Sequence, residues 1–472
     1  MTASTLITGA TIVNADGRQV ADILIRDGII AAIGEAGSLS GDEVIAADGL
    51  HALPGVIDVH VHFRDPGMTH KEDWLTGSQA AALGGVTTVF DMPNTVPPVD
   101  TVDHFRQKAD QAQAKCIVDY GIYGLLGEHN LDQLGPLAEA GVIGFKLFLG
   151  NTTGDLPCPS DGAVLEGFEI LAKLGLRCSI HAENSPILFW RQNRMKAAGR
   201  ADAYAHLAAR TDVVAVEALS RSGVLAEWTG ARIHIVHESC AASIPYIRWF
   251  KSRGVDITVE TLPQYLYLSA EQMLEPGGHI LRMNPPIRQK AHQEPIWAAL
   301  LDGTIDMVST DHAPHGVDEK DGDTIWDMAC GFPGVQTSLP LMLHAVSEGR
   351  MALEDVVRVM SVAPAKAFGL YGRKGVIRVG AEADIALVDP EKPHVITKEG
   401  LASRGKLTPY DGWKVNGTVV RTMVRGQTVA LDGEAVGEAG CGRMVRPEMP
   451  APAPRNTATT TEAILEPGAR PW

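Results

Sequence analysis

An apolar run that ends in two histidines decides the fold of this chain: Leu53-Pro54-Gly55-Val56-Ile57-Asp58-Val59-His60-Val61-His62. The run has the length and the β-branched content of a buried strand, and we expect it to form one. Residues i and i+2 of a strand point to the same side, so His60 and His62 would leave the strand in one direction. Two imidazoles on one rigid element indicate a metal site, although a short His pair alone is weak evidence.

The middle of the chain alternates apolar, strand-like runs with helix-like segments such as 74–83 and 100–114. Eight strands that alternate with helices predict an α/β fold, the (β/α)8 barrel of the TIM type. In such barrels the active site lies at the C-terminal ends of the strands. The expected strands are residues 56–62, 86–91, 117–123, 142–148, 176–181, 232–237, 256–260 and 305–310.

The two ends of the chain have a different pattern. Short strand-like runs separated by turn residues fill the first fifty residues, and the same pattern returns at about 376–435. Two β-rich ends around an alternating middle predict one small β-sandwich domain built from both termini. The expected parts are a first sandwich segment at 1–53, the barrel at 54–370, a second sandwich segment at 371–444 and a Pro-, Ala- and Thr-rich tail at 445–472, which contributes no core.

The composition is that of a globular protein, with 472 residues of which 45% are hydrophobic and 21% charged. The formal charge of −16 argues against nucleic acid and anionic membranes as partners, but not against a small anionic substrate. No window is apolar enough to span a bilayer, and the N-terminus lacks a signal-peptide pattern. The six cysteines are scattered, which fits reduced thiols. These features predict a cytoplasmic enzyme.

Metal-binding or titratable side chains recur at the ends of the expected strands. They are His60 and His62 on the first, Lys146 on the fourth, His181 on the fifth, His237 on the sixth and Asp311 on the eighth. Four imidazoles and a carboxylate at one barrel mouth are better explained by divalent metal than by chance. Lys146 either pairs with a nearby carboxylate or reacts with carbon dioxide to give an anionic carbamate that bridges two metals. The five other ligands favour the carbamate, because a buried ammonium beside two cations would be costly.

Five short motifs around these residues resemble the binuclear amidohydrolases. The motifs are His60-Val61-His62, Gly144-Phe145-Lys146, His181-Ala182-Glu183, His237-Glu238-Ser239 and Thr310-Asp311-His312. The resemblance covers nearly the whole chain and implies a cyclic amidohydrolase: dihydroorotase, allantoinase, hydantoinase or dihydropyrimidinase. It also implies a barrel flanked by a β-sandwich, as a homo-dimer or homo-tetramer.

The resemblance further implies two divalent metal ions, with zinc as the usual choice, bridged by a carbamate on Lys146. The remaining ligands would be His60, His62 and Asp311 at one ion, and His181 and His237 at the other. Two cations lower the pKa of bound water, so that hydroxide forms near neutral pH. Asp311 would take up the proton as general base and return it to the leaving ring nitrogen as general acid.

Two segments resemble class I dihydroorotase: His62-Phe63-Arg64-Asp65-Pro66-Gly67 and Met92-Pro93-Asn94-Thr95. In that family an arginine, an asparagine and the last histidine of the Asp311–His315 motif hold the substrate carboxylate. The matching residues here are Arg64, Asn94 and His315. A guanidinium suits this role because it donates two parallel hydrogen bonds to a carboxylate. The alternative for Arg64 is a surface ion pair with Asp65 or Asp73.

The segment Arg282-Met283-Asn284-Pro285-Pro286 resembles the pyrimidine-contacting segment of dihydroorotase, with Asn284 as the contact. We therefore expect a small anionic cyclic amide as substrate, dihydroorotate, opened to N-carbamoyl aspartate in pyrimidine biosynthesis.

Other motifs favour a different member of the group. His181-Ala182-Glu183-Asn184 and Leu262-Pro263-Gln264-Tyr265-Leu266 resemble hydantoinases and allantoinases more than dihydroorotase. Allantoinase or hydantoinase (dihydropyrimidinase) is therefore the alternative function. A remoter alternative is an inactive dihydroorotase-like scaffold, which would bind little zinc although every ligand position is filled here.

Overall fold

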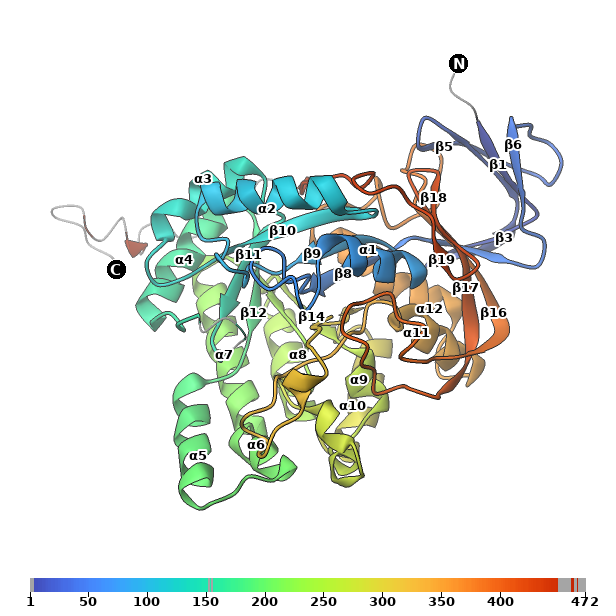
Figure 1. Cartoon of the computed structure of the whole chain (residues 1–472). Coiled ribbons are helices and arrows are strands. Elements are labelled where there is room, and N and C mark those ends of the chain that lie inside the picture. The colour runs from blue at the N-terminus through green and yellow to red at the C-terminus, as the bar shows by residue number, and fades with distance from the viewer. Residues whose placement is uncertain (1–3, 152, 154–155, 449–459, 462–464, 466–472) are drawn as a thin grey trace.

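The computed structural model describes residues 4–151, 153, 156–448, 460–461 and 465 (Figure 1). Eight strands lie in chain order in one parallel sheet. The sheet nearly closes into a barrel, because Val61 bridges His312 and the His62 N–H donates to the His312 carbonyl at 2.8 Å. These strands are β8 (Val56–Val61), β9 (Val86–Asp91), β10 (Asp119–Leu125), β11 (Gly144–Phe148), β12 (Arg177–His181), β13 (Arg232–Ile235), β14 (Ile257–Thr261) and β15 (Met307–Val308). The predicted TIM-type barrel is confirmed.

Helices cover the outside of the barrel and start at well-formed caps. The side chains of Asp73, Thr101 and Ser160 accept hydrogen bonds from first-turn N–H groups of α1, α2 and α4, which fixes where these helices begin. Two of the helices, α5 and α6, are inserted between β12 and α7, and the sequence pattern did not predict them. The helices are α1 (Trp74–Leu83), α2 (Val102–Lys115), α3 (Leu134–Ala140), α4 (Asp161–Leu174), α5 (Ser185–Ala197), α6 (Ala203–Ala209), α7 (Asp212–Thr229), α8 (Ile244–Ser252), α9 (Pro263–Tyr267), α10 (Gln293–Leu301), α11 (Ser338–Ser347), α12 (Leu353–Val357) and α13 (Ala363–Ala367).

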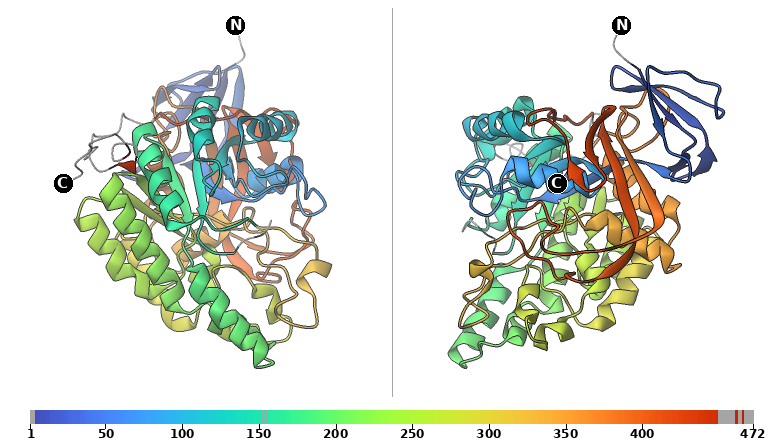
Figure 2. Two further views of the ribbon diagram at one scale, coloured as in Figure 1. Left: turned by 90° about the vertical axis from the view of Figure 1, so that its left-hand side faces the viewer. Right: turned by 45° about the vertical axis from the view of Figure 1, so that its right-hand side comes forward.

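Two further sheets lie beside the barrel and come from the chain ends (Figure 2). The first has the order β5-β4-β1-β6. The second, β19-β18-β17-β16-β7-β2-β3, unites both termini, because β7 pairs with β16 on one side and with β2 on the other. The strands are β1 (Thr5–Thr8), β2 (Thr11–Asn14), β3 (Gly17–Val20), β4 (Asp22–Arg26), β5 (Ile29–Gly34), β6 (Glu43–Ala46), β7 (His51–Pro54), β16 (Ile385–Val395), β17 (Lys414–Val424), β18 (Gln427–Leu431) and β19 (Glu434–Ala435). The expected union of the two termini is therefore present.

A single residue, Gly55, separates the last sandwich strand of the N-terminal segment from the first barrel strand. A Cβ at Gly55 would lie 2.1 Å from the Thr87 hydroxyl, so only glycine fits at this junction. The predicted tail at 445–472 falls mostly outside the described residues. Val445 itself is buried, and its N–H donates to the Tyr120 carbonyl at 2.8 Å, so the chain still contributes to the core at this point.

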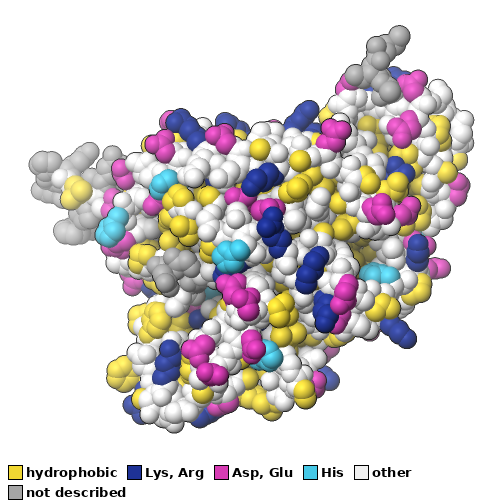
Figure 3. Space-filling model, in the orientation of Figure 1, with side chains coloured by type: hydrophobic (Ala, Val, Ile, Leu, Met, Phe, Trp, Pro, Cys, Tyr) yellow, Lys and Arg dark blue, Asp and Glu magenta, His cyan; other side chains and the backbone are white. Residues whose placement is uncertain are grey.

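Charged side chains of both signs are intermingled on the face shown in Figure 3. The six side chains predicted to bind metal are, in contrast, buried. Among the described residues, no helix is both long and apolar enough to cross a membrane.

Candidate active site

The side chains predicted to bind metal meet at the C-terminal ends of the barrel strands. β8 carries His60 and leads into His62, and β12 ends at His181. Lys146 lies inside β11, which runs on to Phe148, rather than at the strand end. These side chains line one small cavity of about 30 Å³. Its walls also include His237, Asp311, Arg64, Asn94, Phe148, Asn284, Cys330 and Gly331.

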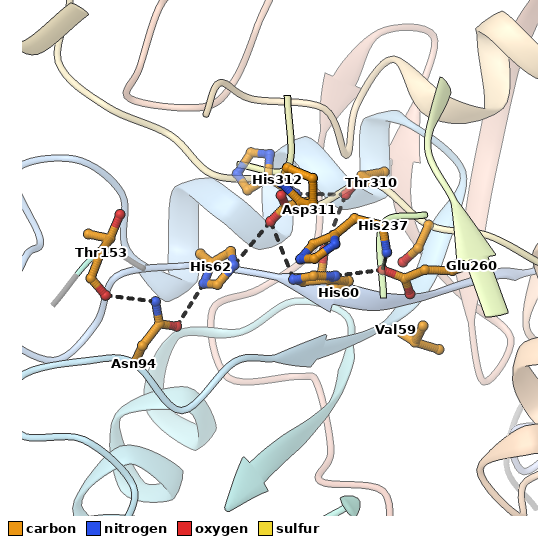
Figure 4. Close-up of polar contacts among 12 residues, drawn as sticks. Val59, His60, His62, Asn94, Thr153, His237, Glu260, Thr310, Asp311 and His312 are labelled. Atoms are coloured by element: carbon orange, nitrogen blue, oxygen red, sulfur yellow. Dashed lines mark hydrogen bonds and ion pairs between the residues drawn. The ribbon is translucent and has the colours of Figure 1, made fainter. Parts of the chain in front are cut away.

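His60 and His62 both point toward Asp311 (Figure 4). His60 Nε2 lies 3.3 Å and His62 Nε2 lies 3.1 Å from Asp311 Oδ1. The other ring nitrogen of each imidazole faces an oxygen: His60 Nδ1 lies 2.6 Å from Glu260 and His62 Nδ1 lies 2.9 Å from the Asn94 amide oxygen. Amide and carboxylate oxygens only accept, so each neutral imidazole faces two acceptors with one hydrogen to donate. The contacts of Nδ1 are the shorter ones in both rings, which places the hydrogen on Nδ1 and leaves Nε2 bare.

Two bare imidazole nitrogens therefore face a carboxylate oxygen at hydrogen-bond distance. Acceptors repel one another unless a cation lies between them, so this arrangement fits a metal ion. His237 completes the group, because ligand atoms of His60, His237 and Asp311 lie within 4.8 Å of one another in a buried place. The His181 and His237 rings also adjoin, with centroids 4.6 Å apart. The donor set is one that divalent metal prefers.

Burial keeps His62, His181 and His237 in the neutral form, which is the form of imidazole that binds metal. It lowers the pKa of His62 to about 3, and it also lowers the pKa of His181 and of His237. Burial raises the pKa of Asp311, but the neighbouring His60 and His62 lower it by more. Asp311 is thus an ionised carboxylate at neutral pH.

Lys146 is fully buried, and its Nζ has no hydrogen-bond partner among the described residues. No described carboxylate lies within ion-pair distance, and the Phe148 ring centroid is 5.0 Å away. Burial lowers the pKa of the Lys146 amine to about 8. The expected alternative of a lysine paired with a carboxylate is therefore not found. With this pKa, about a tenth of the amine is neutral and nucleophilic at pH 7.

The sequence analysis missed Glu260, whose carboxylate contacts three histidines, two of which are predicted metal ligands. One Glu260 oxygen accepts from His60 Nδ1 at 2.6 Å and from the His237 N–H at 3.1 Å, and the other lies 2.9 Å from His234 Nε2. Burial raises the pKa of Glu260, but His60 and His234 hold it well below its usual range. A carboxylate behind a ligand fixes the ring orientation and tautomer. A lone charge in the apolar strand Ile257–Thr261 was the available signal.

A second carboxylate, Glu183, holds His181. His181 Nε2 lies 2.8 Å from Glu183 Oε2, and Arg210 forms an ion pair with the same carboxylate. Burial raises the pKa of Glu183, but Arg210 and the His181 hydrogen bond outweigh it and lower the pKa to about 2. The ionised Glu183 accepts from His181 Nε2, which leaves Nδ1 as the ring atom with a lone pair for metal.

Arg64 lies at the cavity wall with its guanidinium buried. Its Nε and Nη1 atoms have no hydrogen-bond partner among the described residues, and Nη2 lies 3.4 Å from His315 Nε2. Burial lowers the pKa of Arg64 to about 10, so the group remains charged. The expected alternative of an ion pair with Asp65 or Asp73 is not found, because those carboxylates pair with Lys115 and Arg404. His315 does not line the cavity and contacts Arg64 instead.

The two asparagines expected at the substrate both line the cavity, but their amides are already engaged. Asn94 accepts from His62 Nδ1, and its Nδ2 donates to the Thr153 carbonyl at 3.1 Å (Figure 4). Asn94 therefore orients His62, one of the predicted metal ligands. The amide oxygen of Asn284 lies 2.9 Å from His206 Nε2, a second contact that the sequence analysis missed.

The barrel and its histidine-rich mouth define a class, the metal-dependent hydrolases of TIM-barrel fold. The chain matches the amidohydrolase family over residues 51–429 and belongs to that family. It is a cyclic amidohydrolase, an enzyme that hydrolyses a C–N bond of a cyclic amide.

Two relatives from bacteria cover nearly the whole chain. The allantoinase of Deinococcus radiodurans is 37% identical over 450 residues, which are 95% of this chain and 99% of that protein. The L-hydantoinase of Paenarthrobacter aurescens is 35% identical over 93% of this chain and 97% of its own length. Among solved structures, the L-hydantoinase (dihydropyrimidinase) from Arthrobacter aurescens matches with a TM-score of 0.92 at 35% identity, covering 94% of this chain and 100% of that one.

Proposed function

We propose that this enzyme opens the ring of a five-membered cyclic ureide, allantoin or a 5-substituted hydantoin. The observation that carries the proposal is the full-length similarity to allantoinases and to an L-hydantoinase. The motifs 181–184 and 262–266 agree with it. The relatives therefore favour the alternative function over the expected dihydroorotase, and they give no support to a role in pyrimidine biosynthesis.

The proposed centre holds two divalent metal ions, with zinc as the expected element and Lys146 as a carbamate. The neutral Lys146 amine would attack carbon dioxide, forming an N–C bond and releasing one proton, to leave an anionic carbamate. The unpartnered Nζ and its pKa of about 8 support this step. The proposed ligands are His60, His62, His181, His237 and Asp311 with that carbamate. When bound, such ions polarise a carbonyl and make water more acidic.

Asp311 is the proposed proton carrier. Its ionised carboxylate is at the centre of the histidine cluster, so it can take a proton from the attacking water. It would then deliver this proton to the ring nitrogen as the C–N bond breaks. The cavity of about 30 Å³ has room for little more than water in this structure.

Dihydroorotate is the second candidate, and Arg64 is the observation that favours it. A buried guanidinium with two unpartnered nitrogens beside the cavity would bind a substrate carboxylate. Allantoin carries no carboxylate for this purpose. Because of Arg64, a ring with an anionic substituent remains a candidate substrate.

A substrate panel tests the proposal. Metal-loaded enzyme is assayed with allantoin, a 5-substituted hydantoin, dihydrouracil and dihydroorotate. We expect the highest kcat/KM for allantoin or the hydantoin. A kcat/KM for dihydroorotate about tenfold above every other ring would overturn the proposal in favour of the second candidate. An inactive scaffold would open no ring and bind little metal. Homo-dimer or homo-tetramer assembly and a cytoplasmic location stay predictions, the former to be measured by light scattering.

A further inference from the structure

Asn284 reaches the cavity from a firmly anchored segment. The Arg282 carbonyl accepts from the Gly331 N–H at 2.9 Å and from Lys320 Nζ at 2.8 Å. The Tyr265 hydroxyl donates to the Pro285 carbonyl at 2.8 Å. With the backbone fixed on both sides, the remaining freedom of Asn284 is the rotation of its amide, which decides whether the N–H group or the oxygen faces the cavity.

His206 lies behind Asn284, on α6, and is buried. Its Nε2 is 2.9 Å from Asn284 Oδ1, while its Nδ1 has no hydrogen-bond partner among the described residues. Burial, together with the nearby cations Arg210 and Arg282, lowers the pKa of His206 well below its usual range. The ring is therefore neutral and carries one N–H hydrogen.

The surroundings decide which nitrogen carries that hydrogen. If the Asn284 amide were turned around, its Nδ2 would donate to His206 Nε2, and the hydrogen would move to Nδ1. A buried N–H on Nδ1 would have no acceptor and would lie near two cations, whereas a lone pair there is attracted by them. The hydrogen therefore belongs on Nε2, where it donates to Asn284 Oδ1.

We propose that His206 is a positioning residue that fixes the Asn284 amide with its Nδ2 group toward the cavity. Asn284 then offers an N–H donor to the substrate and selects a substrate oxygen over an N–H at this place. A carbonyl oxygen of a cyclic ureide is the acceptor it would select. The identity of the ring rests on the proposed function, but the orientation of the amide does not.

The tautomer of His206 tests the orientation without any turnover. Metal-loaded protein with ¹⁵N-labelled histidine is examined by long-range ¹H–¹⁵N correlation, and the His206→Gln variant identifies the His206 signals by their loss. We expect the neutral form with hydrogen on Nε2. A neutral ring with hydrogen on Nδ1 would overturn the proposal. The tautomer can be determined even if none of the four rings is opened. Such a lack of activity would overturn the proposed function but not the proposed orientation of the Asn284 amide.

A double-mutant cycle tests the effect on substrate. His206→Leu removes the donor, and we expect kcat/KM for the best ring to fall about tenfold, as after the loss of one buried hydrogen bond. Asn284→Ala should fall similarly, and the double variant should fall no further. His206→Gln places an amide N–H where Nε2 was, so it should recover activity to within about threefold of wild type.

Leu207→Ala is the matched control, because Leu207 is the buried neighbour of His206 on the same helix. It should leave kcat/KM within about twofold of wild type. Additive effects of His206→Leu and Asn284→Ala, or an equal fall in Leu207→Ala, would show that α6 acts only as packing and would overturn the proposal.

Discussion

Two buried lysines lie at opposite ends of the barrel, and their surroundings differ completely. Lys374 meets Asp119 at the start of β10, with Nζ 2.7 Å from Asp119 and 2.7 Å from Glu382, and it forms a third ion pair with Asp384. Lys146, at the mouth, has no partner among the described residues. Where a buried charge joins two domains, it is fully compensated. At the proposed metal centre, the buried amine has neither a hydrogen-bond nor an ion-pair partner among the described residues, which leaves it available for reaction.

Backbone conformation does not separate the two ends. Six described residues other than glycine have a positive φ, and three of them, Arg64, His237 and Asp311, line the mouth. A fourth, Arg425, lies in the Lys374 cluster, where it forms an ion pair with Asp119 and its N–H donates to Asp384. Such conformations cost free energy and persist only where the surroundings impose them. The two ends therefore differ in how their buried charge is compensated, not in backbone strain.

The largest effect is expected from Asp311→Ala, because Asp311 is both a proposed metal ligand and the proposed proton carrier. We expect kcat for the best ring to fall by about 10⁴-fold, while the melting temperature stays within a few degrees. Steady-state kinetics and thermal unfolding of the same preparation check this. Turnover within about tenfold of wild type would mean that another base carries the proton.

Lys374→Met should show the opposite pattern to Asp311→Ala, a loss of stability with unchanged catalysis. It is the sharpest test of the contrast between the two buried lysines. Removing the cation leaves the buried carboxylates of Asp119 and Asp384 and the half-buried Glu382 without Lys374 between them, so the free energy of unfolding should fall by about 3–5 kcal/mol. The folded fraction should keep kcat/KM within about twofold. Denaturant unfolding and kinetics at low temperature measure the two quantities. A stable but inactive Lys374→Met variant would break the division between the two ends.

Glu260→Gln tests whether a carboxylate behind the ligands tunes the centre. The amide keeps the shape but loses the charge that holds His60 in its tautomer, so metal affinity should fall about 10- to 100-fold. Titration with metal against a chelator measures this affinity. The control is Glu139→Gln on the exposed face of α3, which should not change it. Unchanged affinity in Glu260→Gln would limit Glu260 to packing.

The smallest effect is expected from Arg64→Met assayed with a ring that lacks a carboxylate. Allantoin or a neutral hydantoin should lose no more than about threefold in kcat/KM. Dihydroorotate should lose about 30- to 1000-fold, the range for removing one side of a desolvated charge pair. A large loss with the neutral ring would show that Arg64 contacts the ring itself.

The barrel could be predicted because its strands are apolar runs bounded by turns. The run 86–91 coincides with β9, and 176–181 differs from β12 by one residue. The last run, 305–310, forms a strand only at Met307–Val308 (β15). In the order of the sheet, β15 is an end strand with one neighbour, β14. The predicted ligand residues could be named because they are the polar exceptions in or at the ends of these runs, and the structure brings them to one cavity.

The residues that orient the site could not be found in this way. Glu260 meets His60 from 200 positions away, and His206 meets Asn284 from 78 positions away, so the contacts exist only in the folded chain. The substrate was harder still. Arg64 favoured dihydroorotate, while the similarity of the whole chain favours allantoin and hydantoins, because the shared metal centre leaves only a few residues to tell the rings apart.

The metal content of three proteins tests the central claim most directly. Wild type, Lys146→Met and Lys374→Met are loaded with zinc, dialysed and analysed by mass spectrometry for metal per folded chain. We expect about two ions in wild type and in Lys374→Met, and no more than about one, without ring opening, in Lys146→Met. Two ions and full activity in Lys146→Met would contradict the claim that the unpartnered lysine exists to bridge metal.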